Sequence, residues 1–74
     1  MRILYVEDNQ IDVDLVEQKL SRSAISSILT QTDTIESAQS ILEKDHALFD
    51  LILIDLDLPD GNGLALLQWI REKN

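Results

Sequence analysis

Acidic residues that follow short apolar runs are the residues of this 74-residue chain most able to do chemistry. The run 49–54 is rich in Ile and Leu and ends at Asp55, and the run 3–6 ends at Glu7 and Asp8. Such runs are typical of strands buried in a parallel sheet, and open α/β sheets bind ligands at the carboxyl ends of their strands. Because a buried carboxylate is costly without a partner, these residues indicate a site.

If the two strands are neighbours, Glu7, Asp8 and Asp55 come together. Three carboxylates in close contact raise one another's pKa unless a cation lies among them. A hard divalent ion with oxygen ligands, Mg²⁺ before Ca²⁺, suits such a group. The alternative to a metal site is that these acids are solvated loop residues at strand ends. That alternative would explain one apolar run ending in an acid. Two apolar runs that each end in acid, in one small chain, favour the metal site.

The elements that must position these acids alternate along the chain. Helical spacing predicts helices over 10–22, from an N-cap at Asp33 to near Asp45, and from near Asn62. Strands are predicted at 3–6, 28–32 and 49–54, which gives the order βαβαβα. Such alternation predicts a parallel sheet with right-handed crossovers. The apolar stripes expected to face the sheet are Ile11, Leu15, Val16 and Leu20; Ile35, Ala38, Ile41 and Leu42; and Leu64, Leu67 and Ile70.

A turn separates the third strand from the last helix. Pro59 fixes its own φ and keeps Leu58 extended. Gly61 and Gly63 permit positive φ or close approach of the backbone, and Asn62 is suited to cap the following helix. An ordinary connection between a strand and a helix explains the proline, the glycines and the asparagine of this turn. It does not explain why a second acid, Asp57, follows Asp55 by two residues.

Composition narrows the class of protein. A net charge of −8 and a pI near 4.2 argue against binding to nucleic acid or to an anionic membrane surface. The chain has no cysteine, and its apolar content of 45% is ordinary for one small globular domain. The first residues turn acidic too early for a signal peptide, and no apolar stretch approaches the length of a membrane span. A cytoplasmic protein is therefore expected.

These motifs resemble the receiver domain of two-component response regulators. The resemblance rests on the acidic pair Glu7-Asp8 after the first strand and on the segment 55–63, Asp-Leu-Asp-Leu-Pro-Asp-Gly-Asn-Gly, after the third. It extends from Met1 to Asn74 in the right order. It implies a flavodoxin-like, doubly wound α/β fold with strand order 2-1-3, and a signalling module rather than an enzyme.

The resemblance also implies a role for each acid. Asp55 would be the phosphoacceptor that takes a phosphoryl group from a histidine kinase or a phosphotransfer protein. Asp8 would ligate Mg²⁺ directly, and Glu7 would act nearby, often through water. The backbone carbonyl of Asp57 would supply a further ligand. Phosphoryl transfer to a carboxylate needs positioning and charge neutralisation, which a bound Mg²⁺ supplies.

The chain departs from the receiver pattern in its length. Residues 1–74 match three of five βα units, so the chain is predicted to be a partial receiver domain. The Ser or Thr of the fourth strand and the Lys of the fifth have no counterpart, and Lys44 and Lys73 lie on predicted helices. Phosphorylation is therefore expected to be impaired. Residues 51–54 would form an apolar sheet edge, so a homodimer through this edge is expected.

Two other functions remain open at the level of sequence. Asp55 and Asp57 also resemble the acids of haloacid-dehalogenase-type phosphatases, although that reading gives Glu7 and Asp8 no role. An interaction fragment with a vestigial acidic site is the second alternative. His46 is expected to be a solvated loop residue, and Asp50 and Asp60 are expected to face solvent.

Overall fold

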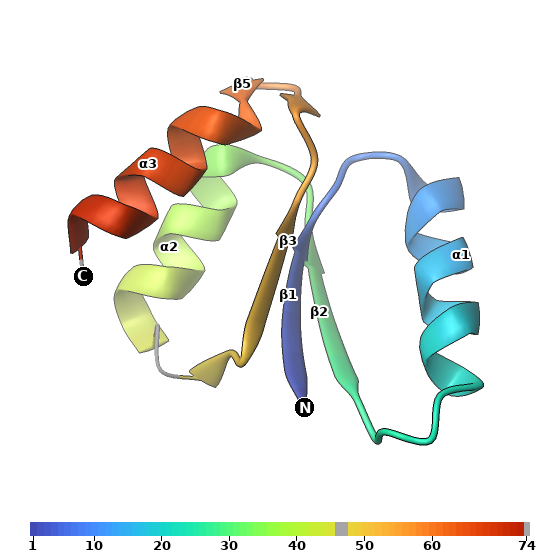
Figure 1. The fold of residues 1–74 in the computed structure, drawn as a ribbon. Helices are drawn as coiled ribbons and strands as arrows, with labels where there is room; N and C mark the ends of the chain where they lie inside the picture. The colour runs from blue at the N-terminus through green and yellow to red at the C-terminus, as the bar shows by residue number, and fades with distance from the viewer. Residues whose placement is uncertain (46–47, 74) are drawn as a thin grey trace.

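A computed structural model describes residues 1–45 and 48–73 of the chain. It shows a parallel sheet between two layers of helix, with α1 on one face and α2 and α3 on the other (Figure 1). The elements are β1 (Arg2–Val6), α1 (Gln10–Ser21), β2 (Ile28–Thr32), α2 (Ile35–Asp45), β3 (Leu51–Ile54), β4 (Asp57–Leu58), β5 (Gly61–Asn62) and α3 (Gly63–Lys73).

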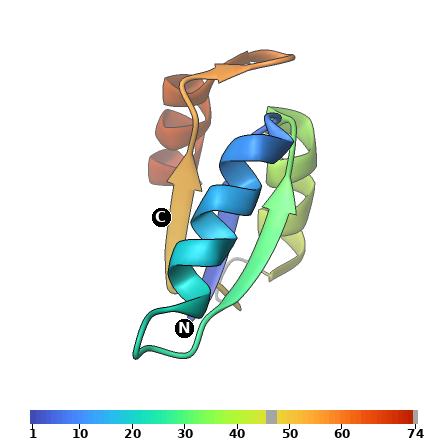
Figure 2. The ribbon, with the colours of Figure 1, turned by 90° about the vertical axis from the view of Figure 1, so that its right-hand side faces the viewer.

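The main sheet has the strand order β2-β1-β3, with both pairings parallel. The predicted α/β fold and strand order 2-1-3 are therefore confirmed. Each crossover carries a helix across the sheet, and Figure 2 shows α1 covering one face from the side. Because β1 lies in the centre, its carboxyl end has a strand end on either side.

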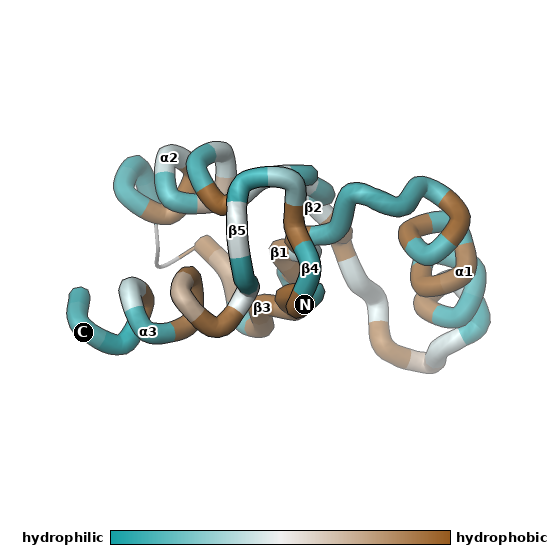
Figure 3. Tube along the Cα trace, turned by 90° about the horizontal axis from the view of Figure 1, so that it is seen from above, coloured by the Kyte–Doolittle hydropathy of each residue, from teal (hydrophilic) through white to brown (hydrophobic). Residues whose placement is uncertain are grey.

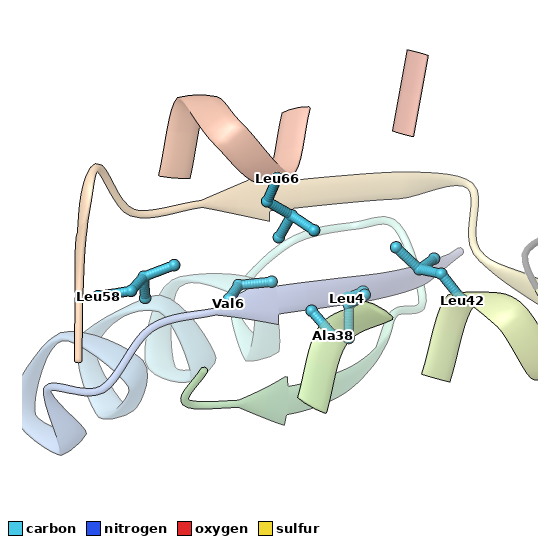
Figure 4. Packing of buried hydrophobic residues seen from close by; sticks show 6 residues of the cluster. All are labelled: Leu4, Val6, Ala38, Leu42, Leu58 and Leu66. Carbon is cyan, nitrogen blue, oxygen red and sulfur yellow. The ribbon is translucent and has the colours of Figure 1, made fainter. Parts of the chain in front are cut away.

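Alternate residues of β1 face the two helical layers on opposite sides of the sheet. Leu4 and Val6 are fully buried among Ala38, Leu42 and Leu66, which come from α2 and α3 (Figure 4). Successive side chains of a strand point to opposite faces, so Ile3 and Tyr5 face the layer of α1. Ile3 is as deeply buried as Val13 of α1. The central strand therefore contributes to the packing of both layers.

Two of the three predicted apolar stripes are wrong in detail. In α1 the buried residue is Val13, whereas Ile11 and Leu15 are exposed. In α3, Gly63 and Leu66 are buried, whereas Leu64 and Leu67 are exposed. The stripe of α2 is confirmed at Ala38 and Leu42. Where a helix has apolar residues over more than one stripe, its packing angle on the sheet decides which stripe is buried.

The capping predictions have mixed outcomes. Asn62 caps α3 as expected, because its Oδ1 accepts a hydrogen bond from the Leu64 amide at 2.7 Å. The predicted N-cap of α2 is wrong by one residue: Thr34 Oγ1, and not Asp33, accepts from the Ser37 amide at 3.0 Å. Asn9 caps α1 by accepting from the Ile11 amide at 3.0 Å.

A short hairpin follows β3, where the sequence predicted a turn. β4 and β5 pair in antiparallel fashion, with Pro59 and Asp60 as the two-residue loop. Gly61 has a φ of +149°, which only glycine adopts readily. The Gly63 amide donates to the Leu56 carbonyl at 2.8 Å, and a Cβ at Gly63 would overlap the carbonyl oxygen of Asp55. Gly63 is therefore required for the close approach of α3 to the end of β3.

β3 is less buried than a strand covered on both faces and both edges. Leu51 is 40% exposed, and residues 52–54 are half-buried. Among the described residues, β3 pairs with β1 and forms one edge of the main sheet. No helix within residues 1–45 and 48–73 is long and apolar enough to cross a membrane.

The substitution Gly63→Ala is expected to lower the free energy of unfolding by roughly 2–3 kcal/mol, since its methyl group must displace the Asp55 backbone or α3. Urea denaturation followed by circular dichroism measures the loss. Gln68→Ala, at an exposed position of the same helix, should change stability by less than about 0.5 kcal/mol. Equal stability of the two variants would contradict the steric explanation.

Candidate functional site

The site lies at the carboxyl ends of β1 and β3, where the strand register brings the acids together. Val6 pairs with Ile54, so Glu7 and Asp55 are the next residues of neighbouring strands. The Asp55 amide donates to the Val6 carbonyl at 3.0 Å, which continues the pairing one residue beyond β3. One carboxylate oxygen from each of Glu7, Asp8 and Asp55 lies within 4.8 Å of the other two. We call these three residues the carboxylate cluster.

Glu7 is the buried member of the carboxylate cluster, with only 5% of its surface exposed. Its backbone is held on the β2 side: its amide donates to the Thr32 carbonyl at 2.9 Å, and its carbonyl accepts from Gln31 Nε2 at 2.7 Å. One carboxylate oxygen accepts from the Asp8 amide at 3.1 Å. These bonds fix Glu7 at the base of the site.

Burial raises the pKa of Glu7 from 4.5 to about 7. A hydrogen bond and charge repulsion from Asp55 add to the effect, followed by the same two effects from Asp12. Tyr5 has its pKa raised as well, first by burial and then by the charges of Glu7, Asp12 and Asp55. Negative charge is therefore concentrated at this end of the sheet without a compensating basic group in these interactions.

The cluster is open to solvent on one side. Asp8 is exposed and Asp55 is half-buried, whereas Glu7 lies beneath them. A ligand can therefore reach the outer carboxylates without unfolding any element. A site with one buried acid and more exposed acids on its outer side suits an ion that keeps water among its ligands.

The chemistry of these donors fits a hard divalent cation. Three carboxylates offer oxygen ligands at one point, and the pKa of Glu7 is raised first by burial and then by Asp55 and Asp12, so a cation beside it would favour its ionised form. Mg²⁺ uses one or two carboxylates together with several waters, which the open side of the cluster allows. The acids present therefore fit the magnesium ion that the sequence predicted.

Asp57 occupies a different position from the other predicted site residues. It lies in β4, is exposed, and its carboxylate is not part of the cluster. The sequence assigned it a role through its backbone carbonyl, and that role stays a prediction. His46 lies outside the described residues.

Sequence reasoning missed the contacts of two further acids. Asp12 lies in the first turn of α1 and adds to the rise in the pKa of Glu7, after burial and Asp55. Its place three residues after the cap Asn9 was a usable signal, because the first turn of a helix lies beside the strand that precedes it. Asp60 is exposed, as expected, and its carboxylate also accepts hydrogen bonds from the amides of Ile35 and Glu36. No sequence signal linked these distant positions.

The fold and the carboxylate cluster together define the class of protein: a parallel α/β protein with an acidic site at its strand carboxyl ends. The family model described as the response regulator receiver domain matches residues 3–74. The chain therefore belongs to the family of response regulator receiver domains.

Individual relatives agree with this assignment. The two-component response regulator ARR10 of Arabidopsis thaliana is 31% identical over 70 residues, which cover 95% of this chain and 12% of that protein. The polar-differentiation response regulator DivK of Brucella ovis is 29% identical over 70 residues, 54% of its length. The chain thus spans about half or less of the length of these relatives.

A solved structure confirms the likeness in three dimensions. The signal receiver domain of a protein described as a Luxo repressor, from Vibrio parahaemolyticus, superposes with a TM-score of 0.83 at 29% identity. The match covers 97% of this chain and 52% of that one. Receiver domains are signalling modules that interact with histidine kinases or phosphotransfer proteins, and the family generally binds Mg²⁺.

The raised pKa of Glu7 predicts how stability depends on pH when no metal is present. The folded chain holds this proton more tightly than the unfolded chain, so the stabilisation is complete below about pH 4.5. It is lost as pH rises through about 7, at a cost on the order of 3 kcal/mol. Glu7→Gln should therefore be more stable than the unmodified chain at about pH 8, and the difference should shrink at about pH 5.

Urea unfolding in the presence of a chelator measures this difference at both pH values. Glu17→Gln, at an exposed position of α1, serves as the control and should follow the unmodified chain. Adding Mg²⁺ should stabilise the unmodified chain at about pH 8 and stabilise Glu7→Gln less, because the cation replaces the proton. Parallel pH profiles for the unmodified chain and Glu7→Gln would contradict the assignment.

Proposed function

We propose that this chain is the phosphoacceptor module of a two-component phosphorelay that acts in the cytoplasm. Asp55 accepts a phosphoryl group from a phosphohistidine on a histidine kinase or phosphotransfer protein. The observation that supports this most directly is the position of Asp55: it is half-buried at the strand end, within 4.8 Å of Glu7 and Asp8. Membership of the receiver family supports the same function.

The same acids are proposed to hold magnesium. Asp8 and Asp55 ligate Mg²⁺ through carboxylate oxygens, Glu7 contributes nearby or through water, and the Asp57 carbonyl completes the protein ligands. When bound, the ion neutralises charge on the carboxylate and on the incoming phosphoryl oxygens. The exposure of Asp8 and the burial of Glu7 support this division of roles.

The chain itself positions the nucleophile. The hydrogen bond from the Asp55 amide to the Val6 carbonyl fixes the backbone of Asp55 beside β1. The absence of a side chain at Gly63 leaves room for the Asp55 carbonyl. A carboxylate oxygen of Asp55 then attacks phosphorus while the bond from phosphorus to the imidazole nitrogen breaks. Such a transfer depends on alignment more than on covalent assistance.

The two lysines of α2 and α3 are placed poorly for holding the transferred group. Lys44 and Lys73 lie in the last turns of α2 and α3, whereas the cluster lies beside the first turns of the helices. Lys73 is engaged elsewhere, with its Nζ 5.4 Å from the centre of the Trp69 ring. We therefore propose that residues 1–74 act as a partial receiver domain in which phosphoaspartate forms but accumulates poorly.

Incubation with a small phosphodonor and Mg²⁺ tests this function. Intact mass spectrometry should show a minor fraction of chains carrying one phosphoryl group, located on Asp55 by fragmentation. Asp55→Asn should abolish the modification, and Asp50→Asn, outside the cluster, should preserve it. Labelling that persists in Asp55→Asn or without Mg²⁺ would refute the function, and complete labelling would refute the impairment. A generic phosphomonoester should not be hydrolysed, whereas turnover would favour the phosphatase alternative.

A second proposed property is self-association through β3. Residues 51–54 of this edge carry no charge and no proline, the usual protections of a sheet edge. Leu51 on β3 and Leu64 and Leu67 on α3 add exposed apolar surface. A two-fold axis would pair β3 with its copy and bury these residues in both chains. The charge of −8 opposes the pairing, and salt at ordinary concentration screens it.

Light scattering at micromolar concentration is expected to give the mass of a dimer. Leu51→Lys should restore the monomer, because it places a charge on the β3 edge at an already exposed position. Ile28→Lys, exposed on the opposite edge strand β2, is the matched control and should leave the dimer intact. A monomeric mass for the unmodified chain would disprove self-association. Equal effects of the two lysines would disprove the choice of edge.

A further inference from the structure

The start of α2 is capped from a distant part of the chain. The first amides of a helix have no partner within the helix. Thr34 satisfies the Ser37 amide locally. The Ile35 amide donates to Asp60 Oδ1 at 2.8 Å, and the Glu36 amide donates to Asp60 Oδ2 at 3.0 Å. A residue about 25 positions away thus completes the cap that the local sequence leaves unfinished.

Asp60 reaches α2 because it stands at the tip of the β4–β5 hairpin. Figure 3 shows this hairpin extending from the end of β3 toward the start of α2. Leu58 and Gly61 pair with each other on either side of the two-residue loop. Leu58 is buried in the main core, and a Cβ on Gly61 would come within 3.1 Å of Ile35 Cδ1. The hairpin therefore lies directly against the first turn of α2.

The contact of Asp60 closes a ring made of chain segments and hydrogen bonds, and this ring includes Glu7 and Asp55 of the carboxylate cluster. Glu7 is bonded through its backbone to Thr32 at the end of β2, and β2 leads into α2. Asp60 links α2 to the hairpin, which continues back to Asp55. The Asp55 amide bonds to Val6, next to Glu7. Each other link belongs to a strand pairing or to the chain itself, and among the described residues Asp60 supplies the side-chain hydrogen bonds that join the hairpin to α2.

The charge of Asp60 suits this position. A carboxylate at a helix N-terminus interacts favourably with the helix dipole. The two amide bonds, from Ile35 first and Glu36 second, lower the pKa of Asp60. The carboxylate therefore stays ionised, and an amide side chain would replace only part of its contribution.

We propose that Asp60 is a positioning residue that clamps the loop after Asp55 to the start of α2 and thereby couples the carboxylate cluster to that helix. The proposal rests on the function proposed for Asp55 and its metal. The clamp holds the segment that contains Asp57 and Gly63 in place, so that cation binding requires less ordering of this loop. By reciprocity, a cation at the cluster stabilises the contact between the hairpin and α2.

Mg²⁺ titration followed by NMR tests the positioning role at a pH where all variants are folded by circular dichroism. Asp60→Ala should weaken Mg²⁺ binding by roughly tenfold, a usual size for coupling between two parts of a protein, because the loop after Asp55 must then be ordered when the ion binds. Asp60→Asn should recover part of the affinity. Thr34→Ala removes the local cap of the same helix, and Asp33→Asn removes one charge beside it. Both controls should bind Mg²⁺ like the unmodified chain.

Amide hydrogen exchange supplies a readout that does not depend on metal. Asp60→Ala should speed exchange at Ile35 and Glu36 and also at Gly63, whose amide bonds to the Leu56 carbonyl. Thr34→Ala should speed exchange at Ser37 and leave Gly63 unchanged. Mg²⁺ should slow exchange at Ile35 and Glu36 in the unmodified chain and have no such effect in Asp60→Ala.

The possible results separate the two proposals. Mg²⁺ affinity that is unchanged in Asp60→Ala, or equally reduced in Thr34→Ala, would overturn the positioning role while leaving the metal site intact. If the unmodified chain binds no Mg²⁺, the proposed function fails. In that case the rate of amide hydrogen exchange at Gly63 tests the contact between the hairpin and α2. Faster exchange in Asp60→Ala supports this contact as the clamp, and an unchanged rate overturns it.

Discussion

The parallel pairing of β1 with β3 is the interaction on which the rest of the structure depends. Its register sets Val6 beside Ile54, and the next residue of each strand is an acid. The same pairing forms the two faces on which α1, α2 and α3 pack. A shift of one residue would move Leu4 and Val6 out of the main core, and it would separate Glu7 from Asp55. The requirement for a packed core therefore also fixes the site.

This arrangement places a buried acid beside other acids at one end of the sheet, at a cost in desolvation first and in charge repulsion second. Glu7 is buried beside Asp55 and Asp12, and its pKa is raised as a result. In a chain of 74 residues, whose core is small, such a cost is a substantial part of the stability. A cation or a proton relieves it. Binding at the carboxylate cluster and folding stability are thus linked by the same acids.

The loop after β3 shows how the site is held from outside the sheet. Gly63 lets α3 approach the Asp55 carbonyl, Leu58 anchors the hairpin in the core, and Asp60 joins its tip to α2. These three contacts use three different properties: the absence of a side chain, apolar burial, and charge at a helix N-terminus. Together they connect the segment after the phosphoacceptor candidate to both helices on that face.

The sequence by itself determined the alternation of the three main strands and three helices and the identity of the clustered acids, whereas the strand order came from the resemblance to receiver domains and the hairpin of β4 and β5 was not foreseen. Apolar runs that end in acid and the glycines around Asn62 are local patterns, so they can be recognised in the sequence. The tertiary structure alone decided which helical stripes are buried, because Ile11 and Leu15 compete with Val13 for the sheet. It also decided that Thr34 and Asp60, rather than Asp33, cap α2. Such contacts depend on how distant segments meet, and residue spacing carries no record of that.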